Sequence, residues 1–243
     1  MGRVRQIAGV TEIERALDAG EDVRVVLVAD DARNAPVRAL VARAERSGIA
    51  VREATRNVIA RLSVVRPAAD ALALVGRDPA ASLDESLARG GAFWLLVGVA
   101  YPGNVGMVIR TAEVSGADGI AIDAEFDHDA KRAALRASMR ADKFMPVFWT
   151  DASNVLDAAK VHGHRVLAVD EAGETTHFAA DLTGARVFVV GGENGGVPAG
   201  VLERCAGRVR VPMAGFIPCY NLQAAVSAVA VERLRQLSPA TPR

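Results

Sequence analysis

Three polar, glycine-containing segments in the C-terminal half of the sequence carry the residue types that could do chemistry. They span residues 101–111, 189–197 and 211–223, and each adjoins an apolar stretch typical of a buried strand or helix. In α/β proteins, the loops that follow buried strands hold many of the binding and catalytic residues. We therefore expect the three segments to assemble a single site.

The first segment places a polar residue and a cationic residue on one predicted helix. Asn104 lies where a strand passes into the helix, whose first-turn amides attract anions. Arg110 follows it at a distance of roughly 9 Å along the helix axis. An arginine among apolar helix residues needs an acceptor, which is either a nearby carboxylate or a bound phosphate or ribose.

The other two segments combine glycines, a carboxylate and apolar surface. Glu193 lies in the loop 191–196, which has neither the spacing of a dinucleotide-binding motif nor the lysine of a P-loop. Its glycines let a ligand approach closely, although such loops are more often ordinary turns. Met213, Phe216 and Asn221 in the third segment suit a ligand with a flat ring and polar edges. The alternative is core packing at the two apolar residues and a helix cap at Asn221.

The elements that must position these segments can be read from the alternation of apolar stretches. Residues 8–76 alternate in a small unit, and a stronger alternation restarts at residue 92, which predicts a parallel sheet with helices on both faces. The predicted strands are 23–28, 49–51, 71–75, 93–99, 119–122, 146–149, 165–169, 186–190 and 209–211. The predicted helices are 10–17, 37–44, 57–62, one starting near 103, 129–139 and 222–237. We therefore expect an α/β protein with a small domain at 1–77, a linker at 78–91 and a larger domain at 92–243.

The composition excludes several classes of protein. Basic and acidic residues balance at 29 each, which argues against a protein that coats nucleic acid through bulk charge. No apolar run reaches the roughly 18 residues of a membrane span, and no secretory leader opens the sequence, so we expect a cytoplasmic protein. Cys205 and Cys219 lack metal-ligand spacing, as do His162 and His164, so we expect no metal site.

In order and spacing, the three segments resemble the motifs of the SpoU–TrmH family. Its members are RNA ribose 2′-O-methyltransferases of the SPOUT class that depend on S-adenosyl-L-methionine (AdoMet). The resemblance covers about residues 92–237. The matched positions are Pro102, Gly103, Asn104, Gly106, Arg110 and Thr111, then Gly191, Glu193 and Gly196, then Val211, Pro212, Met213 and Asn221. The sequence departs from the family pattern at Gly192, Cys219, Tyr220 and Gln223.

This resemblance implies a fold, a cofactor and partners. The larger domain would have the SPOUT fold with its trefoil knot, and family members are usually homodimers. AdoMet would be held by backbone near Gly191, Val211 and Tyr220, with Met213 and Leu222 as apolar walls. The domain 1–77 resembles the ribosomal-protein-like RNA-binding domain of many members, including the thiostrepton-resistance rRNA methyltransferases.

The resemblance also assigns roles in catalysis. Arg110 would hold a phosphate and the reacting 2′-oxygen, while Asn104, Glu193 and Asn221 would orient the ribose. Arg136 aligns with a family arginine that contacts RNA. We expect ribosomal RNA as the substrate, with transfer RNA as the alternative. The competing hypothesis from another class is a non-catalytic RNA-binding protein that keeps the fold.

Overall fold

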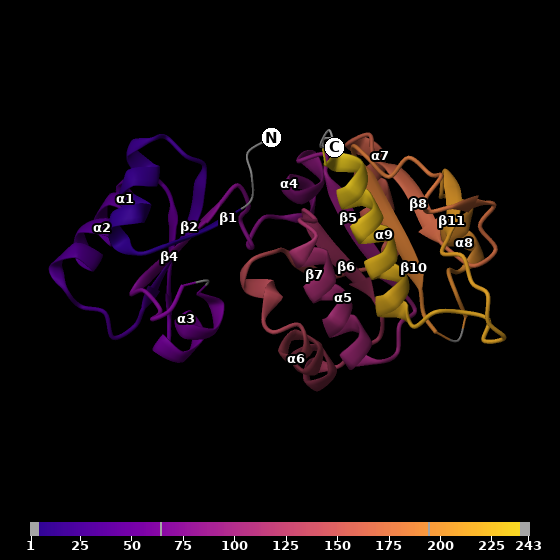
Figure 1. The fold of residues 1–243 in the computed structure, drawn as a ribbon, viewed down its shortest axis with the longest axis horizontal. Coiled ribbons are helices and arrows are strands. Elements are labelled where there is room, and N and C mark those ends of the chain that lie inside the picture. The colour runs from indigo at the N-terminus through magenta and orange to yellow at the C-terminus, as the bar shows by residue number, and fades with distance from the viewer. Residues whose placement is uncertain (1–4, 64, 194, 239–243) are drawn as a thin grey trace, which may run out of the picture. The chain divides into compact units, whose positions relative to one another are not determined.

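The computed structural model describes residues 5–63, 65–193 and 195–238. Two compact units divide the chain, Met1–Asp78 and Pro79–Arg243. Within the described ranges, none of the helices combines the length and the apolar character that a membrane span requires. Figure 1 shows the elements of both units.

The first unit is a four-stranded sheet with three helices. Its elements are β1 (Arg5–Ala8), α1 (Val10–Asp18), β2 (Val23–Ala29), α2 (Ala35–Arg46), β3 (Ala50–Ala54), α3 (Arg56–Leu62) and β4 (Ala71–Val75). The strand order is β1-β4-β2-β3, in which only β2 and β3 run parallel. Asn34 and Thr55 begin α2 and α3 by accepting hydrogen bonds from the backbone amides of Val37 and Val58, which fixes where these helices start.

The second unit is a seven-stranded parallel sheet with the order β7-β6-β5-β10-β8-β11-β9. Its strands are β5 (Ala92–Val97), β6 (Gly119–Asp123), β7 (Val147–Trp149), β8 (Arg165–Val169), β9 (Thr175–Thr176), β10 (Arg186–Gly191) and β11 (Gly207–Arg210). Its helices are α4 (Leu83–Ala88), α5 (Pro102–Val114), α6 (His128–Ala137), the 3₁₀ turn η1 (Ala141–Lys143), α7 (Ala152–Val161), α8 (Ala199–Leu202) and α9 (Leu222–Leu237).

Helices cover both faces of this parallel sheet, as the sequence predicted. On one face, Val108 of α5 and Val226 of α9 join a core cluster with Trp94 and Phe188. On the other face, Leu87 of α4 and residues of α7 pack in a second cluster. The burial of β5 and β10 on both sides explains their uninterrupted apolar sequences. The trefoil knot stays a prediction.

Two segments differ from the elements expected there. The stretch 78–91 contains α4, which a capping box between Ser82 and Glu85 starts and which buries Leu87 completely. A helix of six residues is too short to show periodicity in the sequence. The helix expected over 129–139 ends at Ala137, because the chain turns into the left-handed conformation at Met139 and Arg140.

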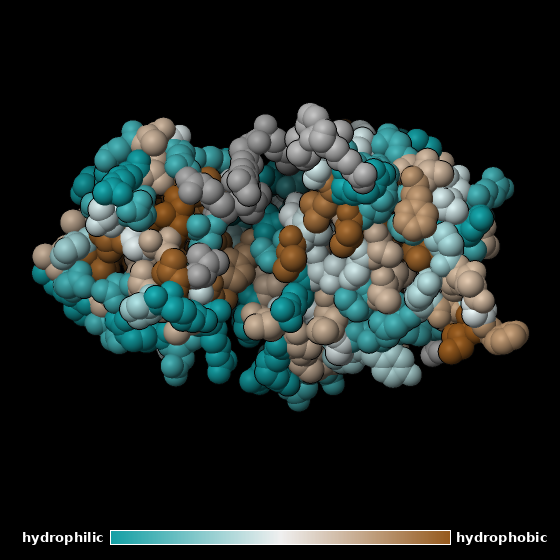
Figure 2. Space-filling view, viewed as in Figure 1, coloured by the Kyte–Doolittle hydropathy of each residue, from teal (hydrophilic) through white to brown (hydrophobic). Residues whose placement is uncertain are grey.

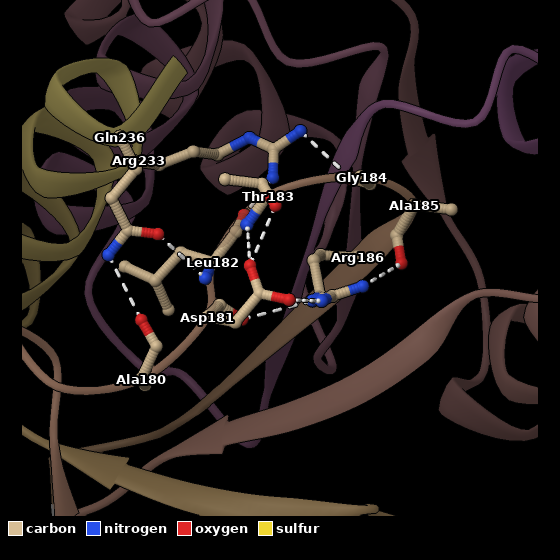
Figure 3. Close-up of polar contacts among 9 residues, drawn as sticks. All are labelled: Ala180, Asp181, Leu182, Thr183, Gly184, Ala185, Arg186, Arg233 and Gln236. Atoms are coloured by element: carbon tan, nitrogen blue, oxygen red, sulfur yellow. Dashed lines mark hydrogen bonds and ion pairs between the residues drawn. The ribbon is translucent and has the colours of Figure 1, made fainter. Parts of the chain in front are cut away.

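The C-terminal turns of α9 hold the loop that leads into β10 (Figure 3). Arg233 is only 8% exposed, and its guanidinium donates to the carbonyls of Leu182 and Gly184. Gln236 accepts from the amide of Leu182 at 2.9 Å and donates to the carbonyl of Ala180 at 3.0 Å. Burial lowers the pKa of the Arg233 guanidinium from its ordinary value. α9 therefore supplies the hydrogen-bond partners of four backbone groups in the loop that precedes β10.

We predict that Arg233→Met lowers the free energy of unfolding by about 1–3 kcal/mol, because it leaves two loop carbonyls without a donor. Urea denaturation followed by circular dichroism measures the change. The control is Arg204→Ala, which removes a surface ion pair with Asp157 and is expected to cost less than about 1 kcal/mol. Equal losses in the two variants would contradict this role of Arg233.

Candidate functional site

The three polar segments meet at the carboxyl edge of the parallel sheet. The first forms the start of α5 after β5, the second follows β10, and the third runs from β11 to the start of α9. A pocket of about 580 Å³ opens among the loops after β8, β10 and β11. All five residues expected to hold the cofactor line it, namely Gly191, Val211, Met213, Tyr220 and Leu222.

Glycines let the loops of this pocket pass at contact distance. A Cβ on Gly191 would lie 1.9 Å from the backbone of Gly196, and one on Gly192 would lie 2.0 Å from the carbonyl oxygen of Gly98. Any larger residue at either position would force the backbone apart. Gly192, where the sequence departs from the family pattern, is therefore required by the close approach of Gly98.

A chain of side-chain hydrogen bonds joins the three segments. Asn104 Nδ2 donates to Glu193 Oε1 at 2.6 Å, and Asn221 Nδ2 donates to Asn104 Oδ1 at 3.4 Å. The second carboxylate oxygen of Glu193 is buried and has no hydrogen-bond partner among the residues that the structure describes. Three of the four residues predicted to act in catalysis are thus brought together, with one acceptor left free.

Asn221 also caps α9, which confirms the helix cap considered for this residue, while its role toward a ligand stays a prediction. Its Oδ1 accepts from the backbone amide of Gln223 at 3.0 Å. The side chain of Gln223 donates to Ser227 Oγ at 2.8 Å, and Ser227 Oγ lies 3.5 Å from Thr111 Oγ1 on α5. Gln223, another departure from the family pattern, therefore links the start of α9 to the helix that carries Arg110.

The two arginines lie outside the pocket lining. Arg110 is exposed on α5, and in the described part of the chain no carboxylate pairs with it. The salt bridge considered as an alternative for Arg110 is therefore not found there. Arg136 is exposed in the last turn of α6. Both guanidinium groups are free to meet a ligand from solvent.

Two acidic residues of the pocket wall were not predicted from the sequence. Asp170 and Glu171 line the pocket from the loop after β8. The sequence pattern could have identified them, because two acidic residues directly follow the apolar strand 165–169. Cys219 lines the pocket and is exposed, whereas burial raises the pKa of the Cys205 thiol to about 11. Across the described residues there is no group of three His, Cys, Asp or Glu side chains that could hold a metal ion.

Comparisons with known proteins agree with this architecture. Residues 92–231 match the model of the SpoU rRNA Methylase family, and residues 6–67 match that of the RNA 2′-O ribose methyltransferase substrate binding domain. The 23S rRNA (guanosine-2′-O-)-methyltransferase RlmB of Pseudomonas syringae is 27% identical over 255 residues, covering 98% of each chain.

Two solved structures share the fold. The AdoMet-bound rRNA methyltransferase from Sinorhizobium meliloti has a TM-score of 0.60 at 23% identity, covering 98% of this chain and 89% of that one. The SpoU methyltransferase AviRb from Streptomyces viridochromogenes has a TM-score of 0.60 at 22% identity, covering 96% of this chain and 89% of that one. With a family model that matches more than half of its length, the chain belongs to the SpoU rRNA methylase family.

Proposed function

We propose that this protein transfers a methyl group from AdoMet to a ribose 2′-hydroxyl of ribosomal RNA. The observation that carries the proposal is the set of hydrogen bonds that joins Asn104, Glu193 and Asn221 beside a pocket lined by the five expected cofactor residues. The relatives whose names specify 23S rRNA support ribosomal RNA over transfer RNA.

The residues that line the pocket suit AdoMet in both polarity and charge. Backbone groups at Gly191 and Val211 can meet the edge of an adenine ring, while Met213 and Leu222 provide apolar walls. Asp170, Glu171 and Glu193 bring carboxylates to a ligand that carries a sulfonium and an ammonium group. When bound, AdoMet would supply an electrophilic methyl group to the acceptor oxygen.

We assign Arg110 to the acceptor ribose and its adjoining phosphate. Its guanidinium stays protonated at ordinary pH, so it is poorly suited to remove the hydroxyl proton. It can instead stabilise the negative charge that develops on the 2′-oxygen, or hold a phosphate oxygen that accepts the proton. The absence of a carboxylate partner among the described residues leaves its donors available for this task.

We assign Asn104, Glu193 and Asn221 to orientation of the ribose. One oxygen of Glu193 is committed to Asn104, so the carboxylate is fixed in direction. Its other oxygen remains an acceptor for a hydroxyl or ammonium donor. An acceptor held rigidly in this way reduces the entropy lost when the substrate is aligned.

Further proposals concern the small unit and the location. We propose that residues 1–77 bind RNA, that 78–91 join them to the methyltransferase domain at 92–243, and that Arg136 contacts RNA. The match of residues 6–67 to the substrate-binding model supports the first of these assignments. A ribosomal RNA substrate would place the protein in the cytoplasm, where bacterial ribosomes are assembled.

We also propose a homodimer that forms through α5 and α9. These helices pack together and expose Val114, Val231, Leu234 and Leu237 on their outer surface. Figure 2 shows hydrophobic residues, in brown, gathered beside the C-terminal half of α9. Because this surface adjoins the helix that carries Arg110, a second subunit seated there would border the site.

A methyl-transfer assay tests the activity. We expect labelled methyl groups to pass from AdoMet to unmodified ribosomal RNA and to make the modified linkage resistant to alkali. Arg110→Ala should reduce the rate by about 100- to 1000-fold, because it removes charge stabilisation in the transition state. Arg110→Lys should remain slower by about tenfold or more, because an ammonium cannot form the guanidinium fork.

Three outcomes of that assay would contradict parts of the proposal. Labelling of transfer RNA alone would overturn the choice of substrate. AdoMet binding without transfer to either RNA would favour the non-catalytic alternative. Nearly full turnover by Arg110→Lys would contradict the role given to the guanidinium fork.

The cofactor pocket makes Cys219 a reporter of AdoMet. At neutral pH, iodoacetamide should modify Cys219 and spare Cys205, because Cys219 is exposed whereas the Cys205 thiol has its pKa raised to about 11. Saturating AdoMet should slow this modification at least about tenfold if it covers the thiol. Mass spectrometry of the digested protein measures both effects, with Cys219→Ser as the control. Unchanged modification in the presence of AdoMet would argue against this pocket.

The dimer surface can be tested with two matched variants. Val231→Glu should convert a dimer into a monomer in sedimentation equilibrium, because it places a charge in the proposed apolar interface. Val161→Glu, at an exposed valine on α7, should leave the dimer intact. A monomeric parent protein, or dissociation of both variants, would contradict the interface.

A further inference from the structure

The turn that ends α6 holds two consecutive non-glycine residues in the left-handed conformation. Met139 has φ 56° and Arg140 has φ 63° with ψ 37°. The amide of Met139 donates to the carbonyl of Arg136, and that of Arg140 to the carbonyl of Leu135, both at 3.1 Å. This pattern of helix termination ordinarily has glycine at the first of the two positions, because a Cβ is unfavourable there.

Neither side chain offsets this backbone cost by packing. Met139 is 61% exposed. Arg140 is also exposed and makes one ion pair, with Asp142 at 3.1 Å. An ion pair whose arginine side chain is 44% exposed adds little stability, although the Asp142 side chain is only 16% exposed. Residues held in an unfavourable conformation without a packing reason are concentrated at functional sites.

The position of the turn connects it to Arg110. Gly106 of α5 lies so close to the end of α6 that a Cβ on it would be 2.5 Å from Ala137 Cβ and 3.0 Å from the amide of Ser138. Arg110 follows Gly106 by one helical turn and so lies on the same face of α5. The 3₁₀ turn η1, which Arg140 begins, also packs against α5. Arg110 and Arg140 therefore belong to neighbouring backbone segments, namely α5 and the turn between α6 and η1.

The chemistry of this surface favours a phosphate-bearing partner. Arg136 adds a third exposed guanidinium in the last turn of α6, and Figure 2 shows hydrophilic, teal residues at the lower edge of the second unit, where α6 lies. Arginine binds phosphate through paired N–H donors, and a backbone phosphate repeats at every nucleotide. One nitrogen of Arg140 is used by Asp142, which leaves other donors for a ligand.

We propose that Arg140 binds a phosphate of the RNA backbone next to the reacting nucleotide, and that the left-handed turn at Met139 and Arg140 is kept because it presents this guanidinium beside Arg110. The inference rests on the proposed function, since it gives the same site a second phosphate contact. Position 140 therefore has two opposed requirements. Glycine suits its left-handed backbone best, whereas arginine binds an RNA phosphate best.

The test compares stability and RNA binding in Arg140→Gly. Glycine suits φ 63°, so we expect the midpoint of thermal unfolding to be unchanged or higher. The Kd for unmodified ribosomal RNA transcripts should rise about tenfold, as expected for loss of a charged hydrogen bond. The slope of log Kobs against log salt should become shallower by about 0.7–0.9, the value for one phosphate contact. In the methylation assay, KM for RNA should rise while kcat stays near that of the parent protein.

Two further variants keep the result interpretable. Arg140→Gln removes the charge but keeps a side chain at the strained position, so it should lose RNA affinity without gaining stability. Arg204→Gln removes an exposed arginine that pairs with Asp157, as Arg140 pairs with Asp142, and should leave RNA affinity unchanged. If Arg140→Gly does not fold, the comparison of Arg140→Gln with Arg204→Gln decides the question.

The possible results distinguish a failure of the Arg140 phosphate contact from a failure of the proposed function on which it rests. A parent protein that methylates RNA, together with an Arg140→Gly variant of unchanged affinity and salt slope, would overturn the phosphate contact alone. An equal loss of affinity in Arg140→Gln and Arg204→Gln would show a general charge effect and would also overturn it. A parent protein that neither binds nor methylates RNA would overturn the proposed function itself.

Discussion

The site depends on the 2.6 Å hydrogen bond between Asn104 and Glu193, two residues that lie 89 positions apart in the sequence. It forms because β5 and β10 are adjacent parallel strands whose ends pair in register, Val97 beside Gly191. The loops that leave these strands therefore start side by side, and one amide can reach the carboxylate of the other. The same amide meets Asn221 through its oxygen, so a single side chain holds all three polar segments together.

This arrangement requires backbone to pass backbone without side chains between them. The loop after β10 folds against itself at Gly191 and against the carbonyl of Gly98 at Gly192. Close passage brings peptide groups to the wall of the pocket, where they offer donors and acceptors in fixed directions. Two of the positions that depart from the family pattern, Cys219 and Tyr220, lie on the lining of this pocket, and the Tyr220 hydroxyl donates to the carbonyl of Pro212 at 3.2 Å.

Much of the fold followed from the sequence, whereas the connections within the site did not. Continuous apolar stretches located β4, β8 and α9 at their observed bounds, because buried strands and a long helix leave strong patterns. The pocket residues were anticipated through resemblance to a family rather than through periodicity. The contact of Asn104 with Glu193 depends on strand order, which no local pattern encodes. The left-handed turn at Met139 and Arg140 could not be foreseen either, because glycine, its usual marker, is missing there.

The helix α9 has a consequence for the timing of biogenesis. It begins at the site with Asn221 and Leu222, and it ends where Arg233 and Gln236 hold the loop that leads into β10, a strand at the centre of the sheet. During translation the chain emerges in order, so the wall of the pocket cannot close until residues 222–237 have left the ribosome. A nascent chain would therefore have a complete pocket only after those residues are released, and a partly synthesised protein would carry the first unit without a complete pocket.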